Sequence, residues 1–333
     1  MQMETQDELF INTEEEDSII KGPFTDDFVE WLNSETQFGS RLFVNNSLVN
    51  GELNTFGGKK NREEKITNTP IVFFHGNGDG ALKSGVDEFG SGWSDVMLTF
   101  MKHGYKPSSM YAYTYGDRDM KTSYSREMRC NLVVRANRFI AAVLEYTGAK
   151  QVDVIGHSMG VSIARKAIIG GRFVDDDGNC PELEMMNDRI RNFVSISGAH
   201  YGMCLCTKDL AVFAKACGEI FGFYSGQRCH IARDQVGACN TFKHVKGECK
   251  TEDYSLFLKN INEREIKEAE RILSIWSEND EVIGPGNFVW GRKTSRHPYS
   301  DKEIIFFNKT HHQTKNDAGI HIYNFINENF LFY

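Results

Sequence analysis

The apolar residues of this chain fall into short, β-branched runs that alternate with longer segments of helical periodicity. The short runs predict strands at 70–74, 109–115, 151–155, 190–197, 272–276 and 304–307. Apolar positions three and four residues apart predict helices at 24–32, 93–103, 129–146, 161–169 and 320–330, and the highly charged segment 262–271 is expected to form another helix with a solvated face. This alternation indicates an α/β fold in which helices cover both faces of a mostly parallel sheet.

The segment between the predicted strand 151–155 and the predicted helix 161–169 reads G-x-S-x-G, with Ser158 at its centre. Strand, tight turn and helix are the context of a nucleophile elbow, in which a strained turn presents a serine hydroxyl at the start of a helix. Gly156 and Gly160 meet the need for small residues on either side of the serine. Free N–H groups and the helix dipole would favour negative charge there. The alternative is an ordinary connection with a surface serine.

Acyl transfer at Ser158 would need an oxyanion hole, and the segment after the predicted strand 70–74 is a suitable place for it. That strand runs directly into the sequence HGNG. The chemistry requires two main-chain N–H groups aimed at the oxyanion of the tetrahedral intermediate. We expect one from Met159, the residue after the serine, and the other from Asn77. Taken alone, the same sequence would be a turn rich in glycine and asparagine.

A serine is a poor nucleophile at neutral pH and needs a base that is held by an acid. Where an elbow of this kind occurs, the three residues follow in the order serine, acid, histidine, each after its own strand. An acidic cluster follows the predicted strand 272–276, and we predict Asp280 as the acid. Glu278 and Glu281 are its rivals.

Two adjacent histidines follow the predicted strand 304–307. Neighbouring side chains on an extended segment face opposite ways, so only one of the two is expected to enter the site. We predict His311, which is nearer the strand end, as the general acid and base, and His312 as a residue in contact with solvent.

Composition and charge narrow the classes of partner. A net charge of −8 over 333 residues, with no basic face, argues against a nucleic-acid partner. Nothing approaches eighteen consecutive apolar residues, so no transmembrane segment is predicted. The histidines could be imagined as ligands of a metal-dependent hydrolase, but they lack metal-ligand spacing, so no metal or other cofactor is expected.

Six of the eight cysteines lie between Cys204 and Cys249. This clustering favours disulfides and an oxidising compartment over a metal site. The stretch at about 203–257 also interrupts the strand–helix alternation, and we interpret it as a cap-like insert over the active end of the sheet. Residues 1–20 are expected to be an acidic, disordered tail without a visible secretory signal, and residues 21–333 a single domain.

Four sequences together make the chain resemble the class 2 lipase group of the α/β-hydrolases, and most of all the nematode lipase-related proteins. They are FFHGNG (73–78), VDVIGHSMG (152–160), SGAHYG (197–202) and THHQTK (310–315). The resemblance covers the chain from about Pro23 onward. It implies an α/β-hydrolase fold and a secreted, calcium-independent serine esterase or triacylglycerol lipase. It also supports Asn77 and Met159 as the oxyanion pair and His311 as the base.

We therefore predict a carboxylic ester hydrolase, a triacylglycerol lipase or lipid esterase, that works through an acyl-enzyme with Ser158, His311 and Asp280. Its partners would be a small-molecule ester or lipid substrate and, transiently, lipid surfaces. The expected location is secreted or lumenal. The alternative is a catalytically silent α/β-hydrolase that serves as a binding or interaction protein, because a fold does not fix a function.

Overall fold

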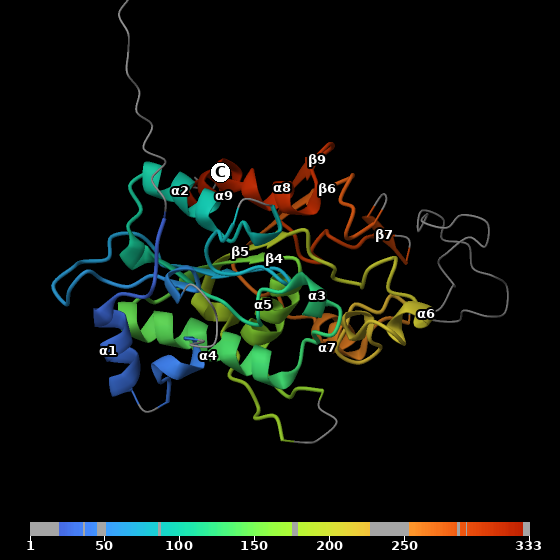
Figure 1. Ribbon diagram of the computed structural model, residues 1–333, viewed down its shortest axis with the longest axis horizontal. Helices are drawn as coiled ribbons and strands as arrows, with labels where there is room; N and C mark the ends of the chain where they lie inside the picture. The colour runs from blue at the N-terminus through green and yellow to red at the C-terminus, as the bar shows by residue number, and fades with distance from the viewer. Residues whose placement is uncertain are drawn as a thin grey trace, which may run out of the picture.

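The computed structural model describes residues 20–35, 37–44, 51–85, 88–174, 179–226, 253–284, 287–290 and 292–328. Within these ranges a seven-stranded sheet has the order β1-β3-β2-β4-β5-β6-β9 and runs through the middle of the molecule (Figure 1). Its strands are β1 (Thr55–Phe56), β2 (Ile71–Phe74), β3 (Met110–Tyr113), β4 (Val152–His157), β5 (Ile190–Ile196), β6 (Arg271–Ser277) and β9 (Lys302–Phe306). Strand β1 is antiparallel to β3, and the other neighbours are parallel.

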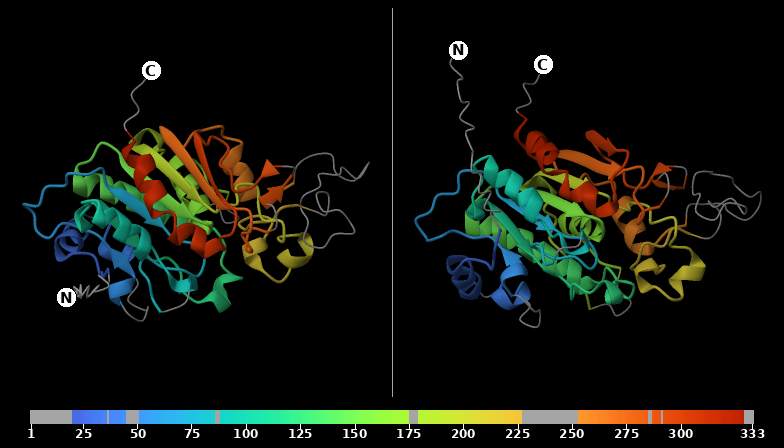
Figure 2. Two further views of the ribbon diagram at one scale, coloured as in Figure 1. Left: turned by 90° about the horizontal axis from the view of Figure 1, so that it is seen from above. Right: turned by 45° about the horizontal axis from the view of Figure 1, so that its top comes forward.

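Helices cover both faces of this sheet, as Figures 1 and 2 show. One face carries α1 (Asp26–Ser34), α4 (Cys130–Thr147), α5 (Met159–Ile169) and α7 (Leu256–Asn262), and the other carries α2 (Ser94–Lys102), α8 (His311–Asn316) and α9 (Gly319–Asn327). Each face has its own cluster of buried apolar side chains. The predicted fold class, an α/β-hydrolase fold with a mostly parallel sheet between helices, is confirmed.

Helix boundaries follow signals that the sequence carries. Thr25 caps α1, with its hydroxyl accepting from the main-chain N–H of Phe28 at 3.4 Å. Helix α4 ends at Gly148, which has a φ of 66°, and α5 ends at Gly170, which has a φ of 58°. Glycine adopts these left-handed conformations without the penalty that a Cβ would bring.

The predicted helix at 262–271 is wrong. The helix in this region, α7, ends at Asn262 and is capped by Ser255, and Glu265 has a φ of 51° that a continuing helix does not allow. Not all of its charged residues are solvated either. Glu268 is fully buried, and Arg264 donates to the carbonyl oxygen of Ile169 at 2.8 Å.

The described part of the insert lies against the segment that follows β3. The N–H of Ala216 donates to the carbonyl of Tyr124 and the N–H of Met128 donates to the carbonyl of Phe221, both at 2.9 Å. Because β3 ends at Tyr113, this contact lies on the side of its carboxyl end. The insert contains the short helix α6 (Lys208–Ala211), and residues 227–252 lie outside the described ranges. Its assignment as a cap stays a prediction.

Disulfides join residues within this insert and in the chain before it. Cys206 is bonded to Cys217 within it, and Cys204 is also disulfide-bonded. A further disulfide joins Cys130, at the start of α4, to Cys180. The preference for disulfides is confirmed for these residues, although the bond outside the 204–249 cluster was not expected.

Short elements without a strong pattern were missed by the sequence analysis. They are β1, α3 (Met120–Ser123), α6, and the two-residue strands β7 (Phe288–Val289) and β8 (Arg292–Lys293), which pair with each other. Segments of two to four residues are too short to show a period of 2 or 3.6.

The turn between β4 and α5 is packed directly against the end of β2. A Cβ added to Gly160 would overlap the carbonyl oxygens of Phe74 and His75, and one added to Gly156 would come within 2.9 Å of the Cα of Val161. Both glycines are therefore required, but Gly160 is required by a neighbouring strand rather than by its own turn.

Replacing Gly160 by alanine should lower the free energy of unfolding by about 2 kcal/mol or more, because two carbonyl groups of the main chain would have to move. Urea unfolding followed by circular dichroism measures the loss. Gly51→Ala is the matched control, since a Cβ there meets no described atom within 4 Å, and we expect its effect to stay within about 0.5 kcal/mol. Equal stability of the two variants would contradict the packing described.

Candidate active site

Ser158 lies at the end of β4 in a conformation that serine seldom adopts. Its φ is 53° and its ψ is −125°, a strained geometry that persists only when the surroundings hold it. Its N–H donates to the carbonyl of Ile196 at 2.9 Å. The side chain makes no capping hydrogen bond to α5 and is half-buried, between fully buried His157 and Met159. The serine hydroxyl is thus presented at the start of α5.

Asp280 and His311 are brought together from two different loops. The Nδ1 atom of His311 lies 2.9 and 2.8 Å from the two carboxylate oxygens of Asp280. The carboxylate also accepts from the N–H groups of Val282 and Ile283 at 3.1 and 2.9 Å. Burial opposes the charge on Asp280, but His311 and the N–H of Ile283 outweigh it and hold the pKa below its usual range. A charged carboxylate therefore faces the imidazole and fixes its Nδ1 as the protonated nitrogen.

The two rival acids have other partners. Glu278 lies 3.6 Å from Lys293 and is 44% exposed. Glu281 accepts from the N–H of His311 at 2.9 Å, so it contacts the histidine through the main chain and not through the ring. Of the three acids in this loop, Asp280 is the one that meets the imidazole.

The expectation that His311 and His312 lie on an extended segment is wrong, because both belong to helix α8. Thr310 and Gln313 form a capping box at its start, in which each side chain satisfies the N–H of the other residue. His312 is not in contact with solvent either. It is buried beside Phe89, with ring centroids 5.1 Å apart, and burial followed by the charge of His311 lowers its pKa to about 4.

His157, the residue before the serine, connects the elbow to α8. Its Nε2 lies 3.2 Å from the carbonyl oxygen of His311, and the two rings are 4.6 Å apart between centroids. Because a carbonyl only accepts, Nε2 carries the proton and donates. Burial is the main reason that the pKa of His157 lies well below its usual value, so the ring is neutral. The elbow and the helix that carries His311 are therefore in direct contact.

The loop after β2 reaches the serine. A Cβ on Gly76 would lie 2.9 Å from Nδ1 of His157 and 3.2 Å from Cβ of Ser158, so only glycine allows this approach. The next residue, Asn77, donates no main-chain hydrogen bond to any described residue. The N–H of Met159 is at the first position of α5, where no intrahelical acceptor exists.

Neighbouring side chains hold this loop in place. The side chain of Asn77 donates to the carbonyl of Ser123 at 2.8 Å, and its amide oxygen accepts from Arg126, which also pairs with Asp117. Neither Arg126 nor Asp117 was predicted, because nothing in their spacing relates them to the loop.

His75 anchors the beginning of the same loop. Its Nδ1 donates to the carbonyl of Gly76 at 2.7 Å, and its Nε2 accepts from the N–H of Tyr115 at 3.0 Å. Burial lowers the pKa of His75 to about 3, against the opposing effect of Asp79, so this histidine is neutral. The start of the loop is therefore tied to the strand end of β3.

A second serine–histidine pair lies deeper in the molecule. Ser195 on β5 has its Oγ 3.0 Å from Nε2 of His200, which is the pairing expected of an activated serine. Both side chains are fully buried, and the Nδ1 of His200 lies 2.9 Å from the guanidinium of Arg165. Arg165 in turn donates to Glu268 at 2.6 Å.

The proton positions in this pair are the reverse of those in an activated serine. Arginine has donors only, so Nδ1 of His200 must accept and its Nε2 must carry the proton. His200 therefore donates to Ser195 and has no free nitrogen to act as its base. Burial, followed by the charge of Arg165, sets the pKa of His200 well below its usual value. We interpret the pair as part of a structural network.

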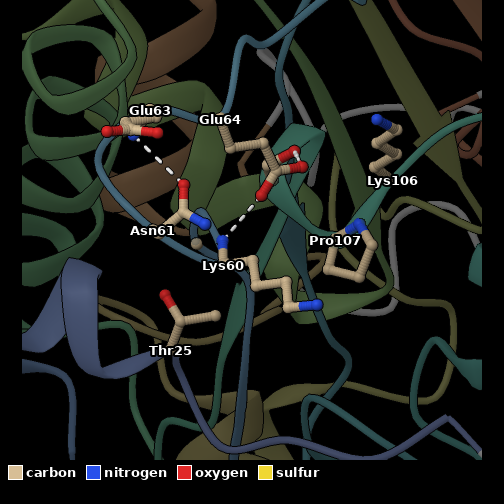
Figure 3. Close-up of a pocket in the computed structure, with 9 residues that line it drawn as sticks. Thr25, Lys60, Asn61, Glu63, Glu64, Lys106 and Pro107 are labelled. Carbon is tan, nitrogen blue, oxygen red and sulfur yellow. Dashed lines mark hydrogen bonds between the residues drawn. The ribbon is translucent and has the colours of Figure 1, made fainter.

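A surface pocket lies far from these residues. It has a volume of about 640 Å³ and is open, and Lys60, Glu64 and Lys106 surround it (Figure 3). Its lining residues precede β2 and β3, whereas Ser158 follows the carboxyl end of the parallel strand β4. The pocket thus lies at the opposite end of the sheet and takes no part in the site.

Among the described residues, no group of three or more His, Cys, Asp or Glu side chains is arranged to hold a metal ion. None of the described helices combines the length and apolarity needed to cross a bilayer.

Replacing His200 by glutamine should make the free energy of unfolding depend less on pH between pH 7 and 5. Neutral His200 must take up a proton on unfolding below about pH 6.5, so the free energy of unfolding falls as pH falls, by up to about 1.4 kcal/mol per pH unit for each proton. Glutamine can accept from Arg165 and donate to Ser195 without titrating. Urea unfolding at pH 7, 6 and 5 tests this, with exposed His103→Gln as the control. An unchanged slope in His200→Gln would show that His200 is protonated in the native protein.

Solved structures similar to the chain include a Paleococcus ferrophilus monoacylglycerol lipase (16% identity, TM-score 0.42, covering 82% of this chain and 96% of that one). Others are an extracellular alpha/beta-hydrolase from a Paenibacillus species (15%, 0.42, 77% and 98%) and the carboxylesterase CesB of Bacillus subtilis (11%, 0.39, 82% and 86%). Their TM-scores are below 0.5, so they carry no argument about activity.

No curated protein matches the chain. The family model for lipase (class 2), in contrast, matches residues 68–324, a range that includes Ser158, Asp280, His311 and the loop after β2. Because the match covers well over half of the sequence, the chain belongs to the class 2 lipase family.

Proposed function

We propose that this protein is a serine carboxylic ester hydrolase that acts on lipid esters through an acyl-enzyme. The observation that carries the proposal is the contact between Asp280 and Nδ1 of His311, on a helix that touches the strained elbow of Ser158. The nucleophile, the orienting acid and the base then follow the ends of β4, β6 and β9, in the chain order serine, acid, histidine.

The roles of the residues follow from their chemistry. Ser158 Oγ attacks the acyl carbon while its proton passes to Nε2 of His311. Asp280, which is charged, stabilises the imidazolium that forms. The N–H groups of Met159 and Asn77 donate to the oxyanion. His311 then returns the proton to the leaving alcohol, and a water molecule, activated by the same histidine, hydrolyses the acyl-enzyme.

The surroundings of the site favour an apolar acyl group. Met120 is 38% exposed and packs against Gly78 in the loop after β2, which we call the oxyanion loop. Phe89 is 45% exposed and packs on His312. On the insert, Val212 and Phe213 are 76% and 86% exposed. Met120 and Phe89 lie beside the site, and exposed apolar side chains in such a place are typical of surfaces that meet lipid or apolar ligands. They support a lipid ester and transient contact with a lipid surface.

The disulfides support the proposed location. Bonds such as Cys130–Cys180 and Cys206–Cys217 form and persist in oxidising compartments, which favours a secreted or lumenal protein. The likeness to the nematode lipase-related proteins, carried by the THHQTK run, also stays part of this proposal.

Hydrolysis of p-nitrophenyl esters with short and long acyl chains tests the choice of nucleophile. Ser158→Ala should lose activity by at least about 10³-fold, whereas Ser195→Ala should keep kcat within about twofold, because Ser195 is buried and receives its hydrogen bond. Loss of activity in Ser195→Ala with retention in Ser158→Ala would reject the proposal. Inactivity of the folded wild type toward every ester would favour a binding protein instead.

The choice of acid is tested by three amide substitutions in one loop. Asp280→Asn should lower kcat by about 10³- to 10⁴-fold, because the amide no longer stabilises the imidazolium or fixes its tautomer. Glu281→Gln still offers an oxygen to the N–H of His311, and Glu278→Gln loses only an exposed pair with Lys293. Both should stay within about threefold of the wild type in kcat/KM. A loss in Glu281→Gln as large as in Asp280→Asn would reassign the acid.

A further inference from the structure

The THHQTK run ends in a lysine that the proposed chemistry does not use. Lys315 follows His311 by one helical turn on α8. Its Nζ lies 2.6 Å from Oδ2 of Asp79, and both side chains are fully buried. Asp79 belongs to the loop after β2, two residues beyond Asn77. One ion pair therefore joins the helix that carries the base to the loop that supplies an oxyanion donor.

The carboxylate of Asp79 also organises its own loop. Its Oδ1 accepts from the N–H groups of Gly80 and Gly92 at 2.8 and 2.9 Å, and its N–H donates to the carbonyl of Gly76 at 3.2 Å. Burial opposes ionisation, but Lys315 leads the groups that hold the pKa of Asp79 below its usual range. The position of Asn77 thus depends on a charged side chain that is held from α8.

A buried ion pair is weak evidence for a contribution to stability. Removing two charges from water costs several kcal/mol per ion, and apolar replacements of similar volume are often as stable or more stable. In some proteins such pairs fix one arrangement of the elements they join, since any other arrangement leaves a buried charge without a partner. Here helix α8 carries the proposed base, His311, and the loop after β2 carries the proposed oxyanion donor, Asn77.

We infer that Lys315 and Asp79 are positioning residues that hold the oxyanion loop in register with the catalytic histidine. The inference rests on the proposed function and adds to it a requirement that the base and the oxyanion donors share one rigid connection. Neither residue touches substrate. Their effect passes through Asn77 and His311, and it should appear in kcat more than in KM.

The test compares Lys315→Met, Asp79→Asn and the double variant with the wild type. Each single variant leaves one buried charge unpaired and should be less stable, whereas the double variant, without either charge, should regain part of that stability. In all three, kcat for a p-nitrophenyl ester should fall about 10- to 100-fold with KM within about threefold, less than the loss of a whole oxyanion donor. Main-chain amides at 76–80 should exchange hydrogen faster.

The pH profile provides a readout that a purely structural role would not move. Lys315→Met removes a positive charge one helical turn from His311, so the acidic limb of kcat/KM should move to higher pH. Asp79→Asn removes a negative charge and should move that limb to lower pH, each by several tenths of a pH unit. The double variant should return the limb to its wild-type position while kcat stays low.

Asp153→Asn is the matched control, since Asp153 is also buried and paired with a cation, Arg191, but lies at the other end of β4. It should lower stability without changing kcat or the pH profile of the folded protein.

Wild-type kcat in the folded single variants, or full recovery of kcat in the double variant, would overturn the inference. If the wild type hydrolyses no ester, the proposed function fails first and the inference fails with it.

Discussion

The carboxyl ends of β2 and β4 approach so closely that no side chain fits between the turns that follow them, and the candidate site depends on that approach. Gly160 lies against the carbonyls of Phe74 and His75, and Gly76 lies against Ser158. The approach packs the loop after β2 against the serine, which has a positive φ of 53°. In acyl transfer, much of the rate enhancement comes from hydrogen-bond donors that are fixed in position before the oxyanion forms. The close packing of these turns fixes the main chain that carries the proposed donors.

Around these turns, the buried charges are paired across different elements, while several histidines stay neutral. Asp280 meets His311, Asp79 meets Lys315, and Arg165 meets Glu268. Burial keeps the pKa of His75, His157 and His200 low. Neutral rings serve as fixed donors and acceptors, so His157 can hold the carbonyl of His311 without adding a charge beside it. The electrostatic environment of the site is therefore set by a few oriented pairs.

Local patterns predicted much of this structure. The elbow, the strands that precede Asp280 and His311, and the helix that ends at Gly148 all show in periodicity and glycine placement. Contacts between polar residues that lie far apart in the sequence were not predicted by these patterns. A sequence shows that Lys315 follows a histidine pair, but not that it meets Asp79, which is 236 residues away. For the same reason the charges at 262–271 indicated a solvated helix, although Glu268 is buried against Arg165.

The central claim, that Ser158 is the reactive serine, is tested most directly by locating a covalent adduct. A fluorophosphonate probe reacts with a serine that has a base and an oxyanion hole. Trypsin would release Ser158 and Ser195 in different peptides, 151–165 and 192–208, after reduction. Mass spectrometry should find one adduct, on Ser158, that is absent from the unfolded protein. An adduct on Ser195, or none on the folded protein, would contradict this account.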